Sequence, residues 1–164
     1  NLVHRVLTFT YKNFEGKVPV ASTPDAASQQ LLAYARVIFS EVDALLAKCS
    51  FKQALKRTMD LAHETNRYLD EKAPWKSLKV DRQQAADALA TAIDVIAILK
   101  TMFYPYLPFS SQKLHEYLGF DGRIEDIHWE IILPQPGQSL RPPQALFTKY
   151  DDAIIEIETQ KLGH

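Results

Sequence analysis

Apolar side chains recur every three to four residues through long stretches of this chain, which is the spacing of one face of an α-helix. The clearest stretch lies between residues 24 and 48, where the repeating positions are Leu31, Ala35, Ile38, Val42 and Leu45. The sequence has only five glycines, whereas tight hairpin turns between antiparallel strands depend on that residue. We therefore predict an all-α fold.

Helix-capping residues divide the apolar pattern into segments. Thr23, Ser50 and Asp81 each precede a repeat and have side chains typical of an N-terminal cap. Gly16 and Gly119 each follow a repeat, where glycine can adopt the left-handed conformation that ends a helix. The expected helices span approximately residues 1–13, 24–48, 51–73, 82–103 and 110–118. Short loops between the four longer helices predict an antiparallel helical bundle over residues 1–119.

The same repeat predicts which side of each helix faces the interior. In the first helix Leu2 and Val6 would point inward, and Asn1 and Arg5 would lie on the opposite side. Buried amides need hydrogen-bond partners, so we expect the amide of Asn66, on the third helix, to hold a neighbouring helix or the following loop in place. The predicted inward stripe of that helix is Phe51, Leu55, Met59, Ala62, Asn66, Leu69 and Ala73.

Residues 120–164 differ in character from the helical part. Prolines recur at positions 134, 136, 142 and 143, residues 129–133 are typical of an isolated strand, and residues 151–161 are typical of an amphipathic helix. A long irregular segment is unusual inside a compact domain. We therefore expect an irregular tail and a C-terminal helix that pack back on the bundle and on a surface outside this chain.

Composition limits the classes of protein to which the chain can belong. Its net charge is −1, so no overall field attracts a polyanion, and any contact with nucleic acid has to be local. The single cysteine, Cys49, excludes an internal disulfide and fits a cytoplasmic protein. No apolar run approaches the ~18–20 residues that span a bilayer, so we expect no membrane partner. The chain starts at Asn1 inside a helical pattern, which favours a segment of a longer protein.

Motifs for catalysis and metal binding do not occur in this sequence. The five histidines lie in separate segments, and none is spaced with a cysteine or carboxylate as zinc ligands are. Neither a glycine-rich phosphate loop nor a nucleophile elbow is found. We therefore expect no catalytic residue, no metal site and no cofactor in this segment.

The residues Ala73-Pro74-Trp75 follow the third expected helix. Because proline lacks an N–H donor and disfavours helix in the residue before it, we expect the helix to stop here and leave Trp75 on a free turn at the rim of the bundle. Asn1 and Arg5 are four residues apart and share a helix face. An amide, a guanidinium and an indole are groups that bind unstacked RNA bases. The basic residues expected to contact phosphates are Lys72, Lys76, Lys79 and Arg82.

Each of these residues also has an ordinary structural interpretation. Large indoles are usually highly buried, so Trp75 alone is compatible with a core or interface position. Arg5 alone is compatible with a surface ion pair. The combination of the two with Asn1 favours base recognition.

Three stretches of the chain resemble the anticodon-binding domain of methionyl-tRNA synthetase, the C-terminal helical domain of a class I aminoacyl-tRNA synthetase. They are Asn1-Leu2-Val3-His4-Arg5, Asn66-Arg67-Tyr68-Leu69-Asp70-Glu71-Lys72-Ala73-Pro74-Trp75 and Gln144-Ala145-Leu146-Phe147-Thr148-Lys149-Tyr150-Asp151. The second stretch is shared with other class I synthetases, whereas the first and third are typical of the methionine enzyme. Tyr150 departs from the usual residue of the third stretch.

The resemblance implies that Asn1, Arg5 and Trp75 contact the CAU anticodon of methionine tRNA, with Pro74 positioning the indole. It also implies that the longer protein is a cytoplasmic methionine–tRNA ligase. Its catalytic domain, in the same chain and before Asn1, would use ATP with magnesium. Two alternatives remain open: the anticodon-binding domain of a valine, leucine or isoleucine synthetase, and a helical module that binds protein instead of RNA.

Overall fold

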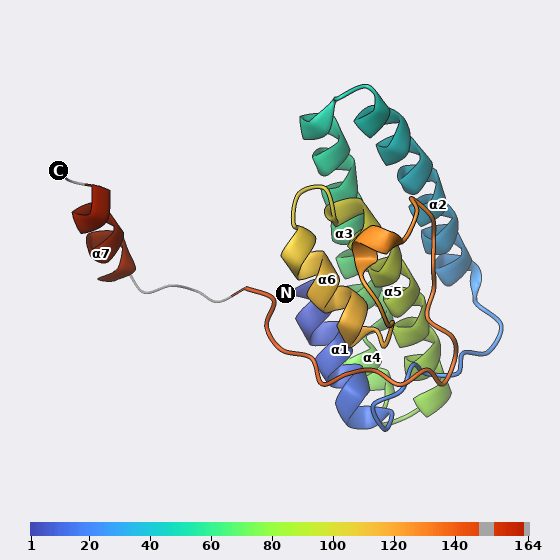
Figure 1. Cartoon of the computed structure of the whole chain (residues 1–164). Coiled ribbons are helices and arrows are strands. Elements are labelled where there is room, and N and C mark those ends of the chain that lie inside the picture. The colour runs from blue at the N-terminus through green and yellow to red at the C-terminus, as the bar shows by residue number, and fades with distance from the viewer. Residues whose placement is uncertain (148–152, 163–164) are drawn as a thin grey trace.

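Helix α5 (Arg82–Phe103) runs through the centre of the fold, with buried residues on most of its sides. The computed structural model describes residues 1–147 and 153–162, and Figure 1 shows the other long helices of the bundle packed around α5. These are α1 (Leu2–Asn13), α2 (Ala26–Ala47), α3 (Phe51–Lys72) and α6 (Pro108–Tyr117), with the short α4 (Pro74–Ser77) directly after α3. No strand occurs in the two described ranges, and the predicted all-α bundle is confirmed.

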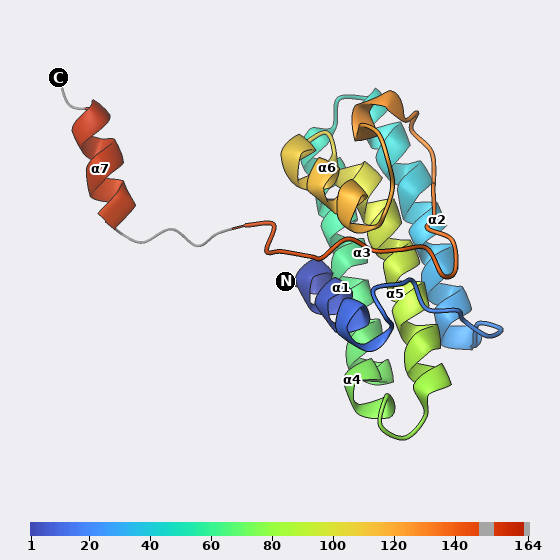
Figure 2. The ribbon, with the colours of Figure 1, turned by 60° about the horizontal axis from the view of Figure 1, so that its bottom comes forward.

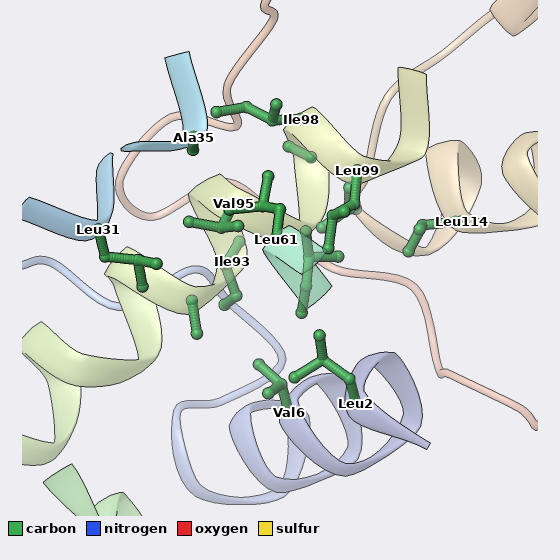
Figure 3. Close-up of a cluster of buried hydrophobic side chains, with 14 of the residues drawn as sticks. Leu2, Val6, Leu31, Ala35, Leu61, Ile93, Val95, Ile98, Leu99 and Leu114 are labelled. Atoms are coloured by element: carbon green, nitrogen blue, oxygen red, sulfur yellow. The ribbon is translucent and has the colours of Figure 1, made fainter. Parts of the chain in front are cut away.

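The core fills the space between α5 and the helices around it. Figure 3 shows Leu2 and Val6 of α1 pointing into this space, toward Leu61 and Ile93. All four side chains are buried, which confirms the predicted inward side of α1. Burial of Leu2 and Val6 leaves Arg5 exposed on the other side of the same helix.

The starts of three helices test the predicted caps. The cap of α5 is confirmed, since the carboxylate of Asp81 accepts hydrogen bonds from the N–H groups of residues 83 and 84, at 2.9 and 3.0 Å. The cap predicted at Thr23 is wrong: the extended Asp25 caps α2 and accepts from the N–H of Ser28 at 2.9 Å. Ser50 makes no capping hydrogen bond because its backbone is not extended.

The predicted inward stripe of α3 is also wrong in part. Phe51 and Met59 are exposed, whereas Ala54, Thr58 and Thr65 are buried. Small side chains at these positions let the backbone of α3 approach its neighbours α2 and α5 closely. The hydroxyls of Thr58 and Thr65 are satisfied within the helix, by the carbonyls four residues earlier. The packed side of α3 therefore combines these small residues with the larger Leu61, Tyr68 and Leu69.

Residues 120–147 cross the surface of the bundle, without a regular element apart from the single turn η1 (Ile124–Asp126). The strand predicted at residues 129–133 is wrong because no neighbouring strand pairs with it in the described ranges. The side chain of Trp129 stacks on Phe39 of α2 instead, with ring centroids 5.0 Å apart. The bundle itself therefore supplies the surface for this segment.

A second part of the tail joins the end of α6 to the loop after α1. The backbone N–H of Leu140 donates to the carbonyl of Gly16 at 2.7 Å, and the side-chain amide of Gln138 donates to the carbonyl of Leu118 at 2.7 Å. Gly119 lies between these contacts with φ +81, and a Cβ added there would stand 2.0 Å from the carbonyl oxygen of Ser139. Only glycine allows this close approach of two backbones.

Helix α7 (Ala153–Leu162) lies apart from the bundle in both views (Figures 1 and 2). Its residues Ile154 and Ile157 are exposed. The packing of this helix on the bundle and on a surface outside this chain stays a prediction. The predicted helix start at Asp151 and the departure at Tyr150 lie outside the described residues. Neither α7 nor any other helix in the described ranges is long and apolar enough to cross a membrane.

A buried lysine links α5 to α6. The side chain of Lys100 is 1% exposed, and its Nζ lies 3.2 Å from Nδ1 of His115 and 4.4 Å from the ring centroid of Phe120. The Nε2 of His115 lies 3.1 Å from the carbonyl oxygen of Asp121, to which it can donate only if Nδ1 is the acceptor for Lys100. Burial lowers the pKa of Lys100 to about 8 and also lowers that of His115.

The close approach at Gly119 gives a first prediction. Gly119→Ala should lower the free energy of unfolding by ~2 kcal/mol or more, because it combines a left-handed alanine with a backbone clash. Gly122→Ala is the matched control, since Gly122 has φ +82 but nothing within 4 Å of an added Cβ, and should cost only about 1 kcal/mol. Urea unfolding measures both values. Equal losses would contradict the packing of the tail on α6.

The buried Lys100 gives a second prediction. Between the folded pKa of about 8 and the ordinary lysine pKa of 10.5, the folded chain binds fewer protons than the unfolded chain, so Lys100 makes stability rise with pH in that window. Lys100→Met should raise the free energy of unfolding at pH 7 by about 1–2 kcal/mol, and this gain should shrink toward pH 10. Lys113→Met, at an exposed position of α6, is the control. A gain independent of pH would contradict burial of the ammonium.

Candidate nucleic-acid interface

The backbone reverses direction at Ala73, between α3 and α4. Ala73 has φ 42 and ψ 57, in the left-handed region, and its N–H donates to the carbonyl of Leu69 at 2.9 Å. Pro74 follows as the buried first residue of α4, where its missing N–H costs nothing. The helix therefore stops where we predicted, but the free turn predicted for Trp75 is wrong, because Trp75 lies inside the short α4.

The indole of Trp75 packs against α1. It is half-buried, with its ring edge-on to Phe9 at a centroid distance of 6.3 Å and an interplanar angle of 89°. The guanidinium carbon of Arg5 lies 4.5 Å from the centroid of the indole ring. Arg5 and Phe9 are one helical turn apart, so a single face of α1 supplies both contacts to the indole.

Arg5 joins three helices through its guanidinium. Besides its contact with Trp75 in α4, its Nη2 donates to Oδ1 of Asn66 in α3 at 3.0 Å, and its Nη1 lies 3.7 Å from Oδ1 of Asp70. The amide nitrogen of Asn66 in turn donates to the carbonyl of Ala62 at 3.1 Å, which orients the amide oxygen toward Arg5. The half-buried Asn66 thus holds the neighbouring helix α1 through Arg5.

Asn1 precedes α1 and is exposed. Its side chain makes no capping hydrogen bond, and its carbonyl accepts from the N–H of Arg5 at 3.0 Å. The amide of Asn1 is therefore presented one helical turn before Arg5, on the side of the bundle that also presents Asn66. In the structure Arg5 contacts both Asn66 and Trp75, and Asn1 lines a common pocket with Asn66.

The four basic residues expected at phosphates fall into two groups. Lys72 pairs with Asp25, and hydrogen bonding to Lys72 lowers the pKa of that carboxyl to about 2. Arg82 donates to the carbonyl of Asn13 at 2.6 Å and lies over the ring of Phe14, directly after α1. Lys76 and Lys79 are exposed, and neither has a side-chain partner among residues 1–147 and 153–162. Only these two have ammonium groups that are available to a ligand.

Sequence reasoning missed two members of this cluster, Phe9 and Asp70. Each lies four residues after a residue that was selected, Phe9 after Arg5 and Asp70 after Asn66. Helical spacing was therefore a signal for both, but without the path of α4 nothing indicated that Arg5 and Phe9 meet an indole. Within the described ranges, no group of three histidine, cysteine or acidic residues could hold a metal ion.

Comparisons with known proteins agree with this geometry. A family model described as the anticodon binding domain of methionyl tRNA ligase matches residues 18–163, a span that includes Trp75 but begins after α1. A methionine–tRNA ligase of Dehalococcoides mccartyi is 44% identical over 163 residues, which cover 99% of this chain and 30% of that protein. One of Chloroflexus aurantiacus is 38% identical over 188 residues, covering 99% of this chain and 31% of that protein.

Solved structures show the same fold. The free methionyl-tRNA synthetase of Mycobacterium tuberculosis superposes with a TM-score of 0.83 at 25% sequence identity, over 92% of this chain and 31% of that protein. The chain thus spans about a third of the length of the relatives that it matches.

The packing of Arg5 over the indole gives a prediction for the free protein. In a Trp129→Phe background, Trp75 is the only tryptophan, and Arg5→Ala should increase its quenching by acrylamide because one ring face is uncovered. The loss of stability should stay near ~0.5–1 kcal/mol, the value of an exposed cation–π contact. Lys12→Ala, also exposed on α1, is the control. Unchanged quenching would show that Arg5 does not cover the ring in solution.

Proposed function

The chain belongs to the family of anticodon-binding domains of methionyl-tRNA ligases, and we propose that it reads the CAU anticodon of methionine tRNA. The observation that carries the proposal is the contact of Arg5 with both Trp75 and Asn66 on an exposed side of the bundle. It places a planar donor group and an aromatic surface next to each other. Unpaired bases are bound in this way, by stacking and by hydrogen bonds to their edges.

We assign the individual roles from the chemistry of each group. The free N–H groups of Arg5 would donate to the acceptors of a cytosine edge, and the amide of Asn1 would pair with the edge of a base. Trp75 would stack on a base, and Pro74 positions the indole by starting α4. Asn66 supports Arg5 without reading a base itself. Because Arg5 covers part of the indole in the free protein, a stacking base would share that ring with it or displace it.

Phosphate contacts would come from the exposed Lys76 and Lys79, close to Trp75 in sequence. They would add affinity without base discrimination. Lys72 and Arg82 are already engaged within the bundle, so we expect smaller contributions from them. With a net charge of −1, local placement of the two free lysines has to replace an overall positive field.

The remaining two thirds of the ligase would carry out the reaction. We propose that this chain is part of a cytoplasmic methionine–tRNA ligase, in which a catalytic domain of the same polypeptide uses ATP with magnesium to attach methionine to the tRNA. The chain described here would contribute recognition, and none of its residues is assigned a catalytic role. Methionine specificity would arise partly from the anticodon contacts of α1 and α4.

The test is the binding of anticodon stem-loops that differ at single positions of CAU. Trp75→Ala and Arg5→Gln should each reduce discrimination against the changed anticodons by ~1–3 kcal/mol, roughly 5- to 150-fold. Val37→Ala, exposed on the outer side of α2, should have no effect. If both site variants keep a native circular dichroism spectrum and bind CAU with unchanged discrimination, the site is wrong.

The same assay tests the specificity of the site and its affinity for RNA. Tighter binding of a valine, leucine or isoleucine anticodon would contradict the proposed reading of CAU. Phosphate contacts make the affinity for RNA fall steeply as the salt concentration rises. A module that binds only protein has no salt-dependent affinity for RNA. Lys76→Ala and Lys79→Ala should each weaken the salt dependence, and Lys52→Ala, exposed at the far end of α3, should not.

A further inference from the structure

Two basic side chains face each other in the interior of the bundle, Lys100 of α5 and His115 of α6. Each is 1% exposed, and they are the only buried basic residues in the part of the chain that the structure describes. No carboxylate bonds to either of them within residues 1–147 and 153–162. A buried cation is ordinarily paired with an acid, whereas the neighbour of Lys100 is a second base.

The hydrogen bond between the two side chains requires a neutral imidazole. Nε2 of His115 can only donate to the carbonyl oxygen of Asp121, 3.1 Å away, so Nδ1 carries the lone pair that accepts from the ammonium of Lys100 at 3.2 Å. When the ring is protonated, Nδ1 becomes a donor as well. Two cations then face each other at a site shielded from solvent, and repulsion replaces the hydrogen bond.

Other charged groups around the imidazole do not remove this repulsion. They are Glu116 of α6, and Asp121 and Arg141 of the tail. The carboxylate of Asp121 is bound by Arg141 at 3.1 Å, and that of Glu116 accepts from a side-chain amide one helical turn earlier at 2.9 Å. Burial lowers the pKa of His115, and the cations Lys100 and Arg141 add to this effect. The Asp121 carbonyl and Glu116 oppose the lowering without reversing it.

The pair lies where the tail joins α6. The ring of Phe120 stacks on that of His115, with centroids 5.0 Å apart, and its centroid also lies 4.4 Å from Nζ of Lys100. The tail returns to the same place, where the N–H of Arg141 donates to the carbonyl of Tyr117 at 3.0 Å. Because α5, α6 and the tail enclose both charges, the charges reach water only if one of these elements moves.

We propose that Lys100 and His115 form an acid-sensitive latch, which lets residues 115–122 open from α5 when the imidazole is protonated. At neutral pH their hydrogen bond joins α5 to the end of α6, and the contacts of Phe120 add the tail. In acid, opening brings both cations into water and relieves their repulsion. The latch is a property of the fold and does not depend on RNA binding.

The direction of the pH dependence follows from proton linkage. Below the ordinary histidine pKa of 6.5, the open segment binds a proton that the closed segment does not bind. Opening therefore becomes more favourable as the pH falls, by at most about tenfold for each pH unit. Asp94 of α5 has the opposite effect on global stability, because burial raises its pKa to about 6. A local measurement is therefore required.

Hydrogen exchange of residues 115–122 in the whole chain, followed by mass spectrometry, is such a measurement. Protection factors, corrected for the intrinsic pH dependence of exchange, should fall about tenfold between pH 7.5 and 5.5. His115→Gln should make them independent of pH, because its amide can donate to Asp121 and accept from Lys100 but does not titrate. His128→Gln, at an exposed position of the tail, is the control and should keep the tenfold change.

A second measurement tests the latch even if His115→Gln does not fold. The slow exchange of the imidazole C2 hydrogen reports the pH at which His115 titrates. Lys100→Met should move this titration to higher pH, because the ammonium that opposes protonation is absent. Lys113→Met, at an exposed position of α6, should leave the titration where it is.

Three results would overturn the latch. Equal protection at pH 7.5 and 5.5 shows that the segment does not open in acid. A tenfold change that persists in His115→Gln assigns the pH dependence to another group. A titration of His115 that Lys100→Met leaves in place shows that the two charges do not interact. None of these readouts involves RNA, so each of them leaves the proposed function untouched.

Discussion

The left-handed turn at Ala73, between α3 and α4, is the constraint on which the cluster of Arg5, Asn66 and Trp75 depends. A left-handed alanine costs about 1–3 kcal/mol, and hydrogen bonds on both sides hold it: its N–H donates to Leu69, and its carbonyl accepts from Lys76 at 2.8 Å and Ser77 at 3.0 Å. Pro74 cannot continue α3 but fits the first turn of a new helix. The chain therefore turns with both the N–H and the carbonyl of Ala73 hydrogen-bonded, and the residue after Pro74, Trp75, meets α1.

The contacts of Arg5 are a second constraint. They orient its side chain more than they stabilise the fold. Its contacts with Asp70 and Trp75 are solvent-accessible, so each contributes no more than about 1 kcal/mol. Together with the hydrogen bond to Asn66, they restrict a long side chain that would otherwise sample many rotamers. A group that is already oriented loses less conformational entropy when it binds. The anchoring of α1 by buried Leu2 and Val6 gives this arrangement a rigid support.

The long helices of the bundle could be predicted from the sequence because they follow from local rules. The apolar spacing of α2 and α5, and the cap at Asp81, depend on residues within a few turns of one another. The packed side of α3 could not be found in this way, because close contact with α2 and α5 selects small residues such as Ala54 over the larger Met59. The path of residues 120–147 was equally out of reach, since Trp129 is held by Phe39, ninety positions earlier.

In the candidate site, too, the residue types could be selected from the sequence, whereas their contacts could not. Asn1, Arg5 and Trp75 could be selected from their chemistry and from a family resemblance, but the basic cluster was treated as uniform because its members are close in sequence. In the structure, some of these basic residues are bound by partners within the bundle and others are not. A lysine within reach of a carboxylate, as Lys72 is of Asp25, is withdrawn from solvent, whereas Lys76 on the short α4 is exposed and pairs with no carboxylate in the described part of the chain. Proximity in sequence therefore predicts only how many basic residues lie near an interface. The turn at Ala73 decides which of these residues an RNA would contact.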